Sequence, residues 1–197
     1  MKKVAWGMAF YMLSGPVVLL LMMGLTMLPV AGLLGEAMYY VYVLVPGLAS
    51  AGGFYLLMRG TEELGYGGNV DWVRKISMIL AAYGLVETVL YALELMPNLG
   101  VISTILAYAY NLGGFLAVYM MTTSMIHIQL FRRVELYARE LQKWFTIWVL
   151  SGFVGSLISA LSMLTALVEL AAGAVMVVYF FRAAKNYDRN DRNFYVM

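Results

Sequence analysis

The sequence predicts an all-α integral membrane protein, a six-transmembrane-helix bundle built as three hairpins. Hydrophobic residues make up 63% of its 197 residues and charged residues 12%, whereas a soluble domain has about 45–50% and about 25%. A chain of this size has too little interior to hide so much apolar surface from water, so lipid must cover much of it. Long uncharged runs allow six membrane crossings. With six crossings, all the basic residues fall in segments on the same side of the membrane.

Charged residues divide the chain into runs long enough to cross a bilayer, which takes about 20 apolar residues per helix. Apart from Glu87, Glu94 and Glu169, four runs carry no acidic or basic residue: 4–35, 37–58, 76–131 and 144–181. We therefore expect one transmembrane domain, residues 1–182, with helices at 4–28, 34–58, 73–95, 100–130, 144–163 and 165–182. A cytoplasmic polar tail follows at 183–197.

Proline and glycine mark two of the turns between these helices. A Pro-x-x-Gly pattern at 29–32 and again at 97–100 ends one helix and starts the next. The last run has no such mark, but as one helix it would extend about 57 Å at about 1.5 Å per residue, against about 30 Å of hydrocarbon. We therefore expect it to fold back near Ser159–Thr165. Opposite charges three or four residues apart predict a further helix over 132–143.

The basic residues test this scheme, because positively charged loops stay in the cytoplasm. All 13 lie before the first helix, in the second and fourth loops, or after the last helix: Lys2, Lys3, Arg59, Arg74, Lys75, Arg132, Arg133, Arg139, Lys143, Arg182, Lys185, Arg189 and Arg192. The other three loops have none. We therefore expect a multi-pass protein of the plasma membrane with both termini in the cytoplasm.

Charged side chains inside a membrane are costly, so they indicate function. Glu87 and Glu169 stand about 18 Å and about 20 Å from the basic side, at about 1.5 Å per residue. Glu87, Tyr91 and Glu94 fall on one face of the third helix, and Asn111 lies near mid-depth in the fourth. These five residues form our candidate polar intramembrane site, open to the outside.

No lysine or arginine stands at this depth, so each glutamate must be protonated, hydrated or bound to a cation. Two interpretations remain open. The first is a proton- or cation-coupled site, and the second is a pair of protonated glutamates that hydrogen-bond neighbouring helices.

The fifth helix carries small residues at every fourth position, at Ser151, Gly155 and Ser159. Small side chains let two helix backbones approach closely, which drives association where lipid supplies no hydrophobic force. We predict that this ridge packs against another helix, either within the chain or in a second copy.

Composition also excludes several classes of site. The chain has no cysteine and one histidine, so disulfide frameworks, zinc fingers, iron–sulfur clusters and bis-histidine haem are excluded. No catalytic arrangement is present, and we expect no enzyme, metal, cofactor or nucleic-acid partner. The expected partners are the lipid bilayer and a second copy or other membrane subunits. Two functions follow: a small-solute or ion transporter, a channel, or a transporter's membrane binding subunit; and a non-catalytic structural or accessory subunit of a larger complex.

Overall fold

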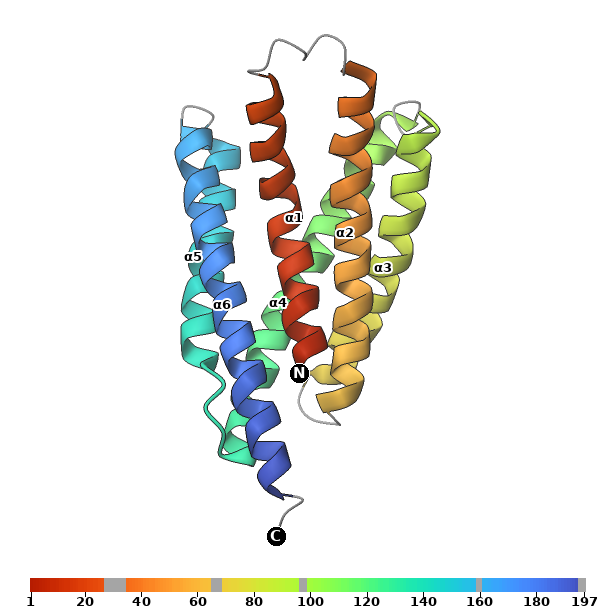
Figure 1. The fold of residues 1–197 in the computed structure, drawn as a ribbon. Coiled ribbons are helices and arrows are strands. Elements are labelled where there is room, and N and C mark those ends of the chain that lie inside the picture. The colour runs from red at the N-terminus through yellow and green to blue at the C-terminus, as the bar shows by residue number, and fades with distance from the viewer. Residues whose placement is uncertain (27–34, 65–68, 96–98, 159–160, 195–197) are drawn as a thin grey trace.

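The computed structural model describes residues 1–26, 35–64, 69–95, 99–158 and 161–194, and in these segments the chain forms six helices (Figure 1). They are α1 (Lys2–Thr26), α2 (Gly35–Leu64), α3 (Val70–Ala92), α4 (Val101–Arg132), α5 (Ala138–Leu157) and α6 (Ser162–Phe194). Among the described residues, three stretches are long and apolar enough to cross a membrane, namely α3, α4 and the part of α6 from Leu164 to Asn190. The structure is therefore a helical bundle suited to a membrane.

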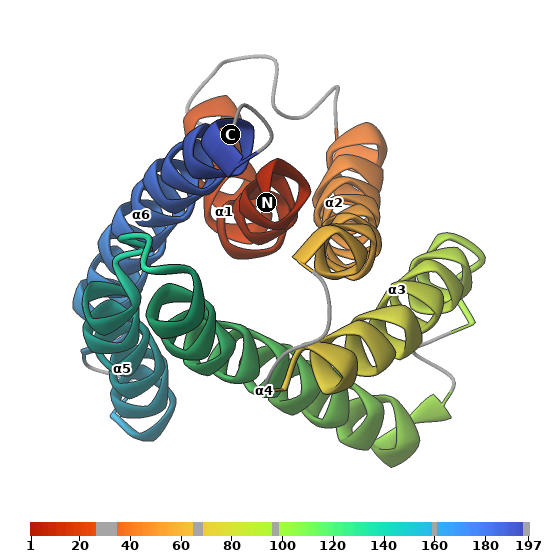
Figure 2. The ribbon, with the colours of Figure 1, turned by 90° about the horizontal axis from the view of Figure 1, so that it is seen from below.

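The helices follow chain order around a ring. Successive helices alternate in direction, and both termini lie at the same end of the bundle (Figure 1). Seen along the bundle (Figure 2), α6 closes the ring by packing against α1. The predicted pairs α1–α2 and α5–α6 pack closely, but α3 packs more extensively on α2 than on α4. The contacts therefore do not by themselves divide the bundle into three hairpins, and that arrangement stays a prediction.

Each predicted helix overlaps one observed helix, but several boundaries differ. The fourth loop was expected to be helical over 132–143, whereas α4 ends at Arg132 and α5 begins at Ala138. Arg133 and Tyr137 have φ values of 53° and 55°, in the left-handed region, which breaks the helix. The amide oxygen of Gln129 then accepts hydrogen bonds from the backbone N–H groups of Leu136 and Ala138, so a side chain replaces the missing helical bonds.

The region expected to be a polar tail, 183–197, differs as well. Helix α6 continues through it to Phe194. Ala183, Ala184 and Tyr187 are buried, and the side-chain amide of Asn186 donates to the carbonyl of Glu135 at 2.9 Å. Packing against the α4–α5 connection thus keeps a polar stretch helical, which hydropathy alone does not reveal. At the opposite end, α5 stops at Leu157 and α6 starts at Ser162, so the chain folds back where the predicted turn begins.

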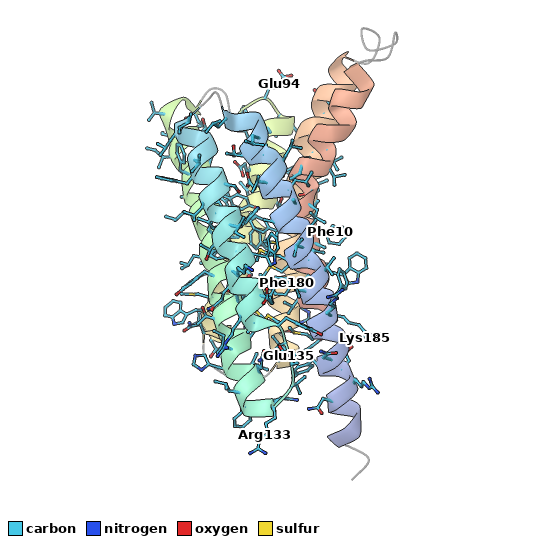
Figure 3. All side chains as sticks on the ribbon, turned by 90° about the vertical axis from the view of Figure 1, so that its left-hand side faces the viewer. Phe10, Glu94, Arg133, Glu135, Phe180 and Lys185 are labelled. Atoms are coloured by element: carbon cyan, nitrogen blue, oxygen red, sulfur yellow. The ribbon has the colours of Figure 1, made fainter. Side chains whose placement is uncertain are left out.

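The thirteen basic residues all lie toward the end of the bundle that holds the termini, which we call the basic end. Figure 3 shows Arg133 and Lys185 toward that end and Glu94 at the other, which we call the outer end. The outer half contains four of the eleven acidic residues, Glu36, Glu87, Glu94 and Glu169, and no basic residue.

The tightly packed core lies in the basic half. Its largest fully buried side chains include Met8, Leu57, Met121, Leu141, Met176 and Phe180. In the outer half, no described side chain is buried beyond Thr88 in α3, before Gly114 in α4, beyond Ser151 in α5 or before Ala172 in α6. The bundle is therefore closed toward the basic end and loosely packed toward the outer end.

Glycines bring α1 and α2 into close contact within this core. A Cβ atom on Gly7 would stand 2.6 Å from the carbonyl oxygen of Gly53, and one on Gly53 would stand 2.7 Å from that of Gly7. A Cβ atom on Gly60 would meet the backbone nitrogen of Val4 at 2.6 Å. The two backbones thus approach as small residues allow in membrane helices.

Candidate functional site

A line of aromatic side chains crosses the interior of the bundle. The ring of Tyr83 on α3 lies 5.3 Å from that of Tyr110 on α4, and Tyr110 lies 5.8 Å from Phe54 on α2. Phe54 in turn lies 4.6 Å from Tyr11 on α1, and Tyr11 lies 6.2 Å from Trp148 on α5. These separations are those of favourable aromatic pairs. We call the five residues the aromatic ladder, and it links five of the six helices.

Glycines on facing helices make room for two of the tyrosine hydroxyls. The Tyr110 hydroxyl lies 2.9 Å from where a Cβ atom on Gly84 would stand, and the Tyr11 hydroxyl occupies the space beside Gly114. The hydroxyls of Tyr83 and Tyr110 are both buried. The Tyr83 hydroxyl lies within hydrogen-bonding reach of Glu87, and the Tyr110 hydroxyl has no hydrogen-bond partner within the described part of the chain. Buried polar groups of this kind are rare, and each calls for an explanation.

Glu87 lies on the interior face of α3, one helical turn nearer the outer end than Tyr83 of the aromatic ladder. Its neighbours on that face, Gly84 and Thr88, are buried, and the Thr88 hydroxyl donates to the Gly84 carbonyl at 2.6 Å. Glu87 itself is half-buried and lies within electrostatic range of the hydroxyls of Tyr83 and Tyr110. The carboxylate therefore stands within hydrogen-bonding reach of the Tyr83 hydroxyl and near the Tyr110 hydroxyl.

Glu169 occupies the matching place on α6. It lies one turn before the buried Ala172 and Gly173, so it shares their interior face. Its carboxyl group lies 3.7 Å from where a Cβ atom on Gly152 would stand, and Tyr11 is within electrostatic range. The carboxylate thus packs beside Gly152 of α5, at a distance at which a Cβ atom there would make ordinary van der Waals contact.

The two carboxylates face the same interior from different sides of the ring. Glu87 reaches the Tyr83–Tyr110 end of the ladder and Glu169 reaches Tyr11. Neither is among the groups that act electrostatically on the other. They are thus linked through tyrosines and do not form a directly coupled pair.

Two further predicted site residues, Tyr91 and Asn111, lie together. They line a pocket of about 350 Å³ between α3 and α4, with Ser103, Thr104, Ala107 and Tyr108. Every lining side chain except Ala107 offers a neutral hydrogen-bonding group. Tyr91 is one helical turn from Glu87, so the pocket lies outward of the carboxylate.

Glu94 lies apart from these residues. It is exposed, has a φ of 55° just beyond the end of α3, and stands at the outer end (Figure 3). We therefore leave it out of the site that the structure brings together.

The predicted small-residue ridge on α5 is partly used inside the bundle. Ser151 is buried and its hydroxyl donates to the Trp148 carbonyl at 2.8 Å, while Gly155 is half-buried. Ser159 lies outside the described residues.

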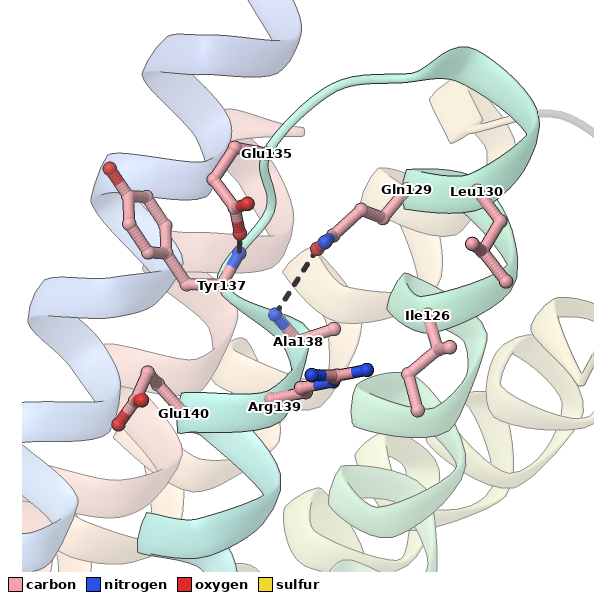
Figure 4. Close-up of a pocket in the computed structure, with 8 residues that line it drawn as sticks. All are labelled: Ile126, Gln129, Leu130, Glu135, Tyr137, Ala138, Arg139 and Glu140. Atoms are coloured by element: carbon pink, nitrogen blue, oxygen red, sulfur yellow. Dashed lines mark hydrogen bonds between the residues drawn. The ribbon is translucent and has the colours of Figure 1, made fainter.

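A second pocket, of about 380 Å³, lies at the basic end between α4 and α5 (Figure 4). Gln129, Glu135 and Arg139 line it. Gln129 and Glu135 already accept backbone hydrogen bonds from Ala138 and Tyr137. The polar groups of this pocket serve the connection between the helices.

Sequence reasoning found the carboxylates but missed the tyrosines between them. Tyr11, Tyr83 and Tyr110 are three of fifteen tyrosines, and they are distinguished by their place in the interior. Two of them, Tyr11 and Tyr110, also lie opposite a glycine on another helix. No group of three or more His, Cys, Asp or Glu side chains gathers among the described residues.

Comparison with known proteins gives no match: no family model fits the sequence, and no curated protein or solved structure is similar to the chain.

Proposed function

We propose that this protein is a membrane transport protein, or the membrane binding subunit of a transporter, whose interior carries a cation or protonated solute. One observation carries the proposal. Glu87 and Glu169 both face the interior of the outer half, where the sequence has no basic residue to neutralise them. Ionisable residues within membrane segments face cavities or pathways and mark ion and proton routes.

The charge distribution supports six spans with both termini in the cytoplasm. Even α5, the shortest helix, has 20 residues, which extend about 30 Å at about 1.5 Å per residue. With all basic residues at the basic end, the positive-inside rule places that end in the cytoplasm. The half-buried carboxylates then open toward the outside.

The same distribution selects for positive charge. A cation entering from the outer end meets only carboxylates, neutral hydroxyls and aromatic rings, whereas an anion meets no favourable charge. Below the carboxylates, the ladder and the packed core close the bundle. A solute would therefore stay bound at the carboxylates until the tyrosine side chains move.

A flux assay tests this proposal. The purified protein would be reconstituted into liposomes, and H⁺, Na⁺ and K⁺ movement would be followed under an imposed gradient. We expect flux of at least one cation with the wild type, and its loss in Glu87→Gln and Glu169→Gln. Glu94→Gln is the matched control, because it removes a carboxylate outside the site. Absence of flux with all three cations would contradict a pathway for protons or these inorganic cations.

One observation favours the alternative, an accessory subunit of a larger complex. Asn111 is exposed on α4 well inside its apolar length, and Thr104 is exposed one helical turn from its start. Lipid offers such groups no hydrogen bond, whereas a neighbouring subunit could. If flux fails in the assay above, co-purification of a second membrane protein that is lost in Asn111→Leu would support this role.

A further inference from the structure

We propose that the interior site takes a protonated amine that carries an apolar or aromatic group. This inference rests on the proposed cation pathway and names its substrate class. It draws on the separation of the carboxylates, on the aromatic rings beside Glu87, over which no lysine or arginine of the described residues lies, and on the buried hydroxyl of Tyr110.

The carboxylates fit an organic cation better than a bare metal ion. Calcium takes about six to eight oxygen ligands and magnesium about six, all within about 2.0–2.6 Å. Among the described residues no three acidic or metal-binding side chains come together. Glu87 and Glu169 lie toward different ends of the ladder, so they can flank an extended molecule but cannot chelate a single ion.

Among the cation–ring contacts that the structure describes, none involves the aromatic rings beside Glu87. Toward the basic end, basic side chains of the protein lie over aromatic rings. Lys75 lies over Trp72, Arg132 over Tyr187 and Arg182 over Tyr179. In the described part of the chain, Tyr83 and Tyr110 contact only other rings in this way. A cation within about 6 Å of an aromatic face is attracted by it, most strongly where water is excluded.

The buried hydroxyl of Tyr110 indicates that the cation donates hydrogen bonds. This hydroxyl has no hydrogen-bond partner among the described residues and lies within electrostatic range of Glu87, whereas the Tyr83 hydroxyl is within hydrogen-bonding reach of that carboxylate. An ammonium group with N–H bonds would donate to the carboxylate and to the Tyr110 oxygen together, which gives that hydroxyl a partner. A quaternary ammonium has no N–H and cannot do so. The apolar part of the ligand would contact the ladder.

Calorimetric titration of the full chain in detergent tests this inference with three matched probes. These are 2-phenylethylammonium, its neutral analogue 2-phenylethanol, and its quaternary analogue trimethyl(2-phenylethyl)ammonium, each corrected for empty micelles. We expect the primary ammonium to bind about tenfold or more tightly than either analogue, because only it has both charge and N–H donors. Equal affinity for the primary ammonium and either analogue would overturn the inference.

Variants locate the binding. Glu87→Gln and Tyr110→Phe should each weaken binding of 2-phenylethylammonium by about tenfold. Tyr55→Phe, at an exposed tyrosine on α2, and Glu94→Gln are the matched controls and should leave the affinity unchanged. Thermal melting of each variant would confirm that it is folded. If Tyr110→Phe binds like the wild type, the inference fails.

The liposome assay separates this inference from the proposed function. Flux of an inorganic cation or of protons without amine binding would overturn the amine inference and leave the pathway standing. Amine binding that needs Glu87, with no flux of any kind, would support the inference and point to a binding subunit. Absence of both would overturn both.

Discussion

Glu63 joins the start of α1 to the end of α2 at the basic end, beyond the proposed span 34–58. Its carboxylate accepts a hydrogen bond from the amino group of Met1 at 3.2 Å and pairs with the Lys3 ammonium at 2.5 Å. Burial raises the pKa of Glu63, but the hydrogen bonds and charges of Lys3 and the Met1 amino group outweigh it, so the pKa lies below its ordinary value.

This pKa predicts how acid affects stability. Because the folded-state pKa is lowered, the contribution of Glu63 is present above the unfolded-state pKa of about 4.3 and is lost as pH falls through the folded value. We expect wild type to melt at a higher temperature than Glu63→Gln near neutral pH, and the difference to shrink below about pH 4.

Melting curves in detergent at a series of pH values measure this effect. Glu62→Gln is the control, because Glu62 pairs at 2.9 Å with Arg59 on the same helix and forms no ion pair with a second helix in the part of the chain that the structure describes. A difference between wild type and Glu63→Gln that stays constant down to the lowest pH would contradict the pairing.

At this scale, the sequence allowed prediction of the carboxylates but not of their surroundings. Glu87 and Glu169 are recognisable because charge inside an apolar run is costly wherever it points. The role of Tyr110 depends on Gly84 of another helix, and a single helix does not show what faces it. Whether Tyr91 and Asn111 share a pocket likewise depends on how α3 and α4 cross.

At the scale of helices, the closest backbone contact lies between α1 and α2. Gly53 faces the backbone of Gly7, whereas its neighbour Gly52 has nothing within 4 Å of where a Cβ atom would stand. We predict that Gly53→Ala destabilises the protein by about 1–3 kcal/mol, because a methyl group there must push two backbones apart.

Gly52→Ala is the matched control, since it adds the same methyl group on the same helix into open space. Equilibrium unfolding in mixed detergent would compare the two variants. We expect Gly52→Ala to be equal to the wild type or more stable, because alanine favours helix. Equal stability of Gly53→Ala and Gly52→Ala would show that α1 and α2 are further apart than described.

Hydropathy predicted the helices well but not their ends. The thickness of the membrane sets the length of apolar helix needed to cross it. However, α2 continues to Leu64 and α6 continues to Phe194 through polar sequence. Those extensions are held by burial of Leu64 and Tyr187 against other helices, which is a tertiary effect. The predicted α5 ridge drew attention to small residues, but α1 and α2 also approach closely at Gly7, Gly53 and Gly60.

At the scale of the whole molecule, the separation of charge predicts the orientation. All basic residues lie toward the basic end, together with both termini. We predict that green fluorescent protein fused after residue 197 fluoresces in cells, because it folds in the cytoplasm, and that alkaline phosphatase fused there is inactive. An active phosphatase fusion with a dark fluorescent fusion would contradict six spans and imply an odd number.

The central claim is that the outer half of the interior is open to water while the basic half is closed. The chain has no cysteine, so single cysteines can report this with a membrane-impermeant maleimide added to intact cells. The informative positions are Tyr91, which lines the outer pocket, Glu94, which is exposed at the outer end, and Met121, which is fully buried in the core.

We predict that Tyr91→Cys and Glu94→Cys are labelled from outside in the folded protein, and that Met121→Cys is labelled only after denaturation. This pattern is expected if water reaches the level of the carboxylates from the outer side and no further. If Tyr91→Cys reacts only after denaturation, while Glu94→Cys reacts at once, the interior is sealed and the account is contradicted.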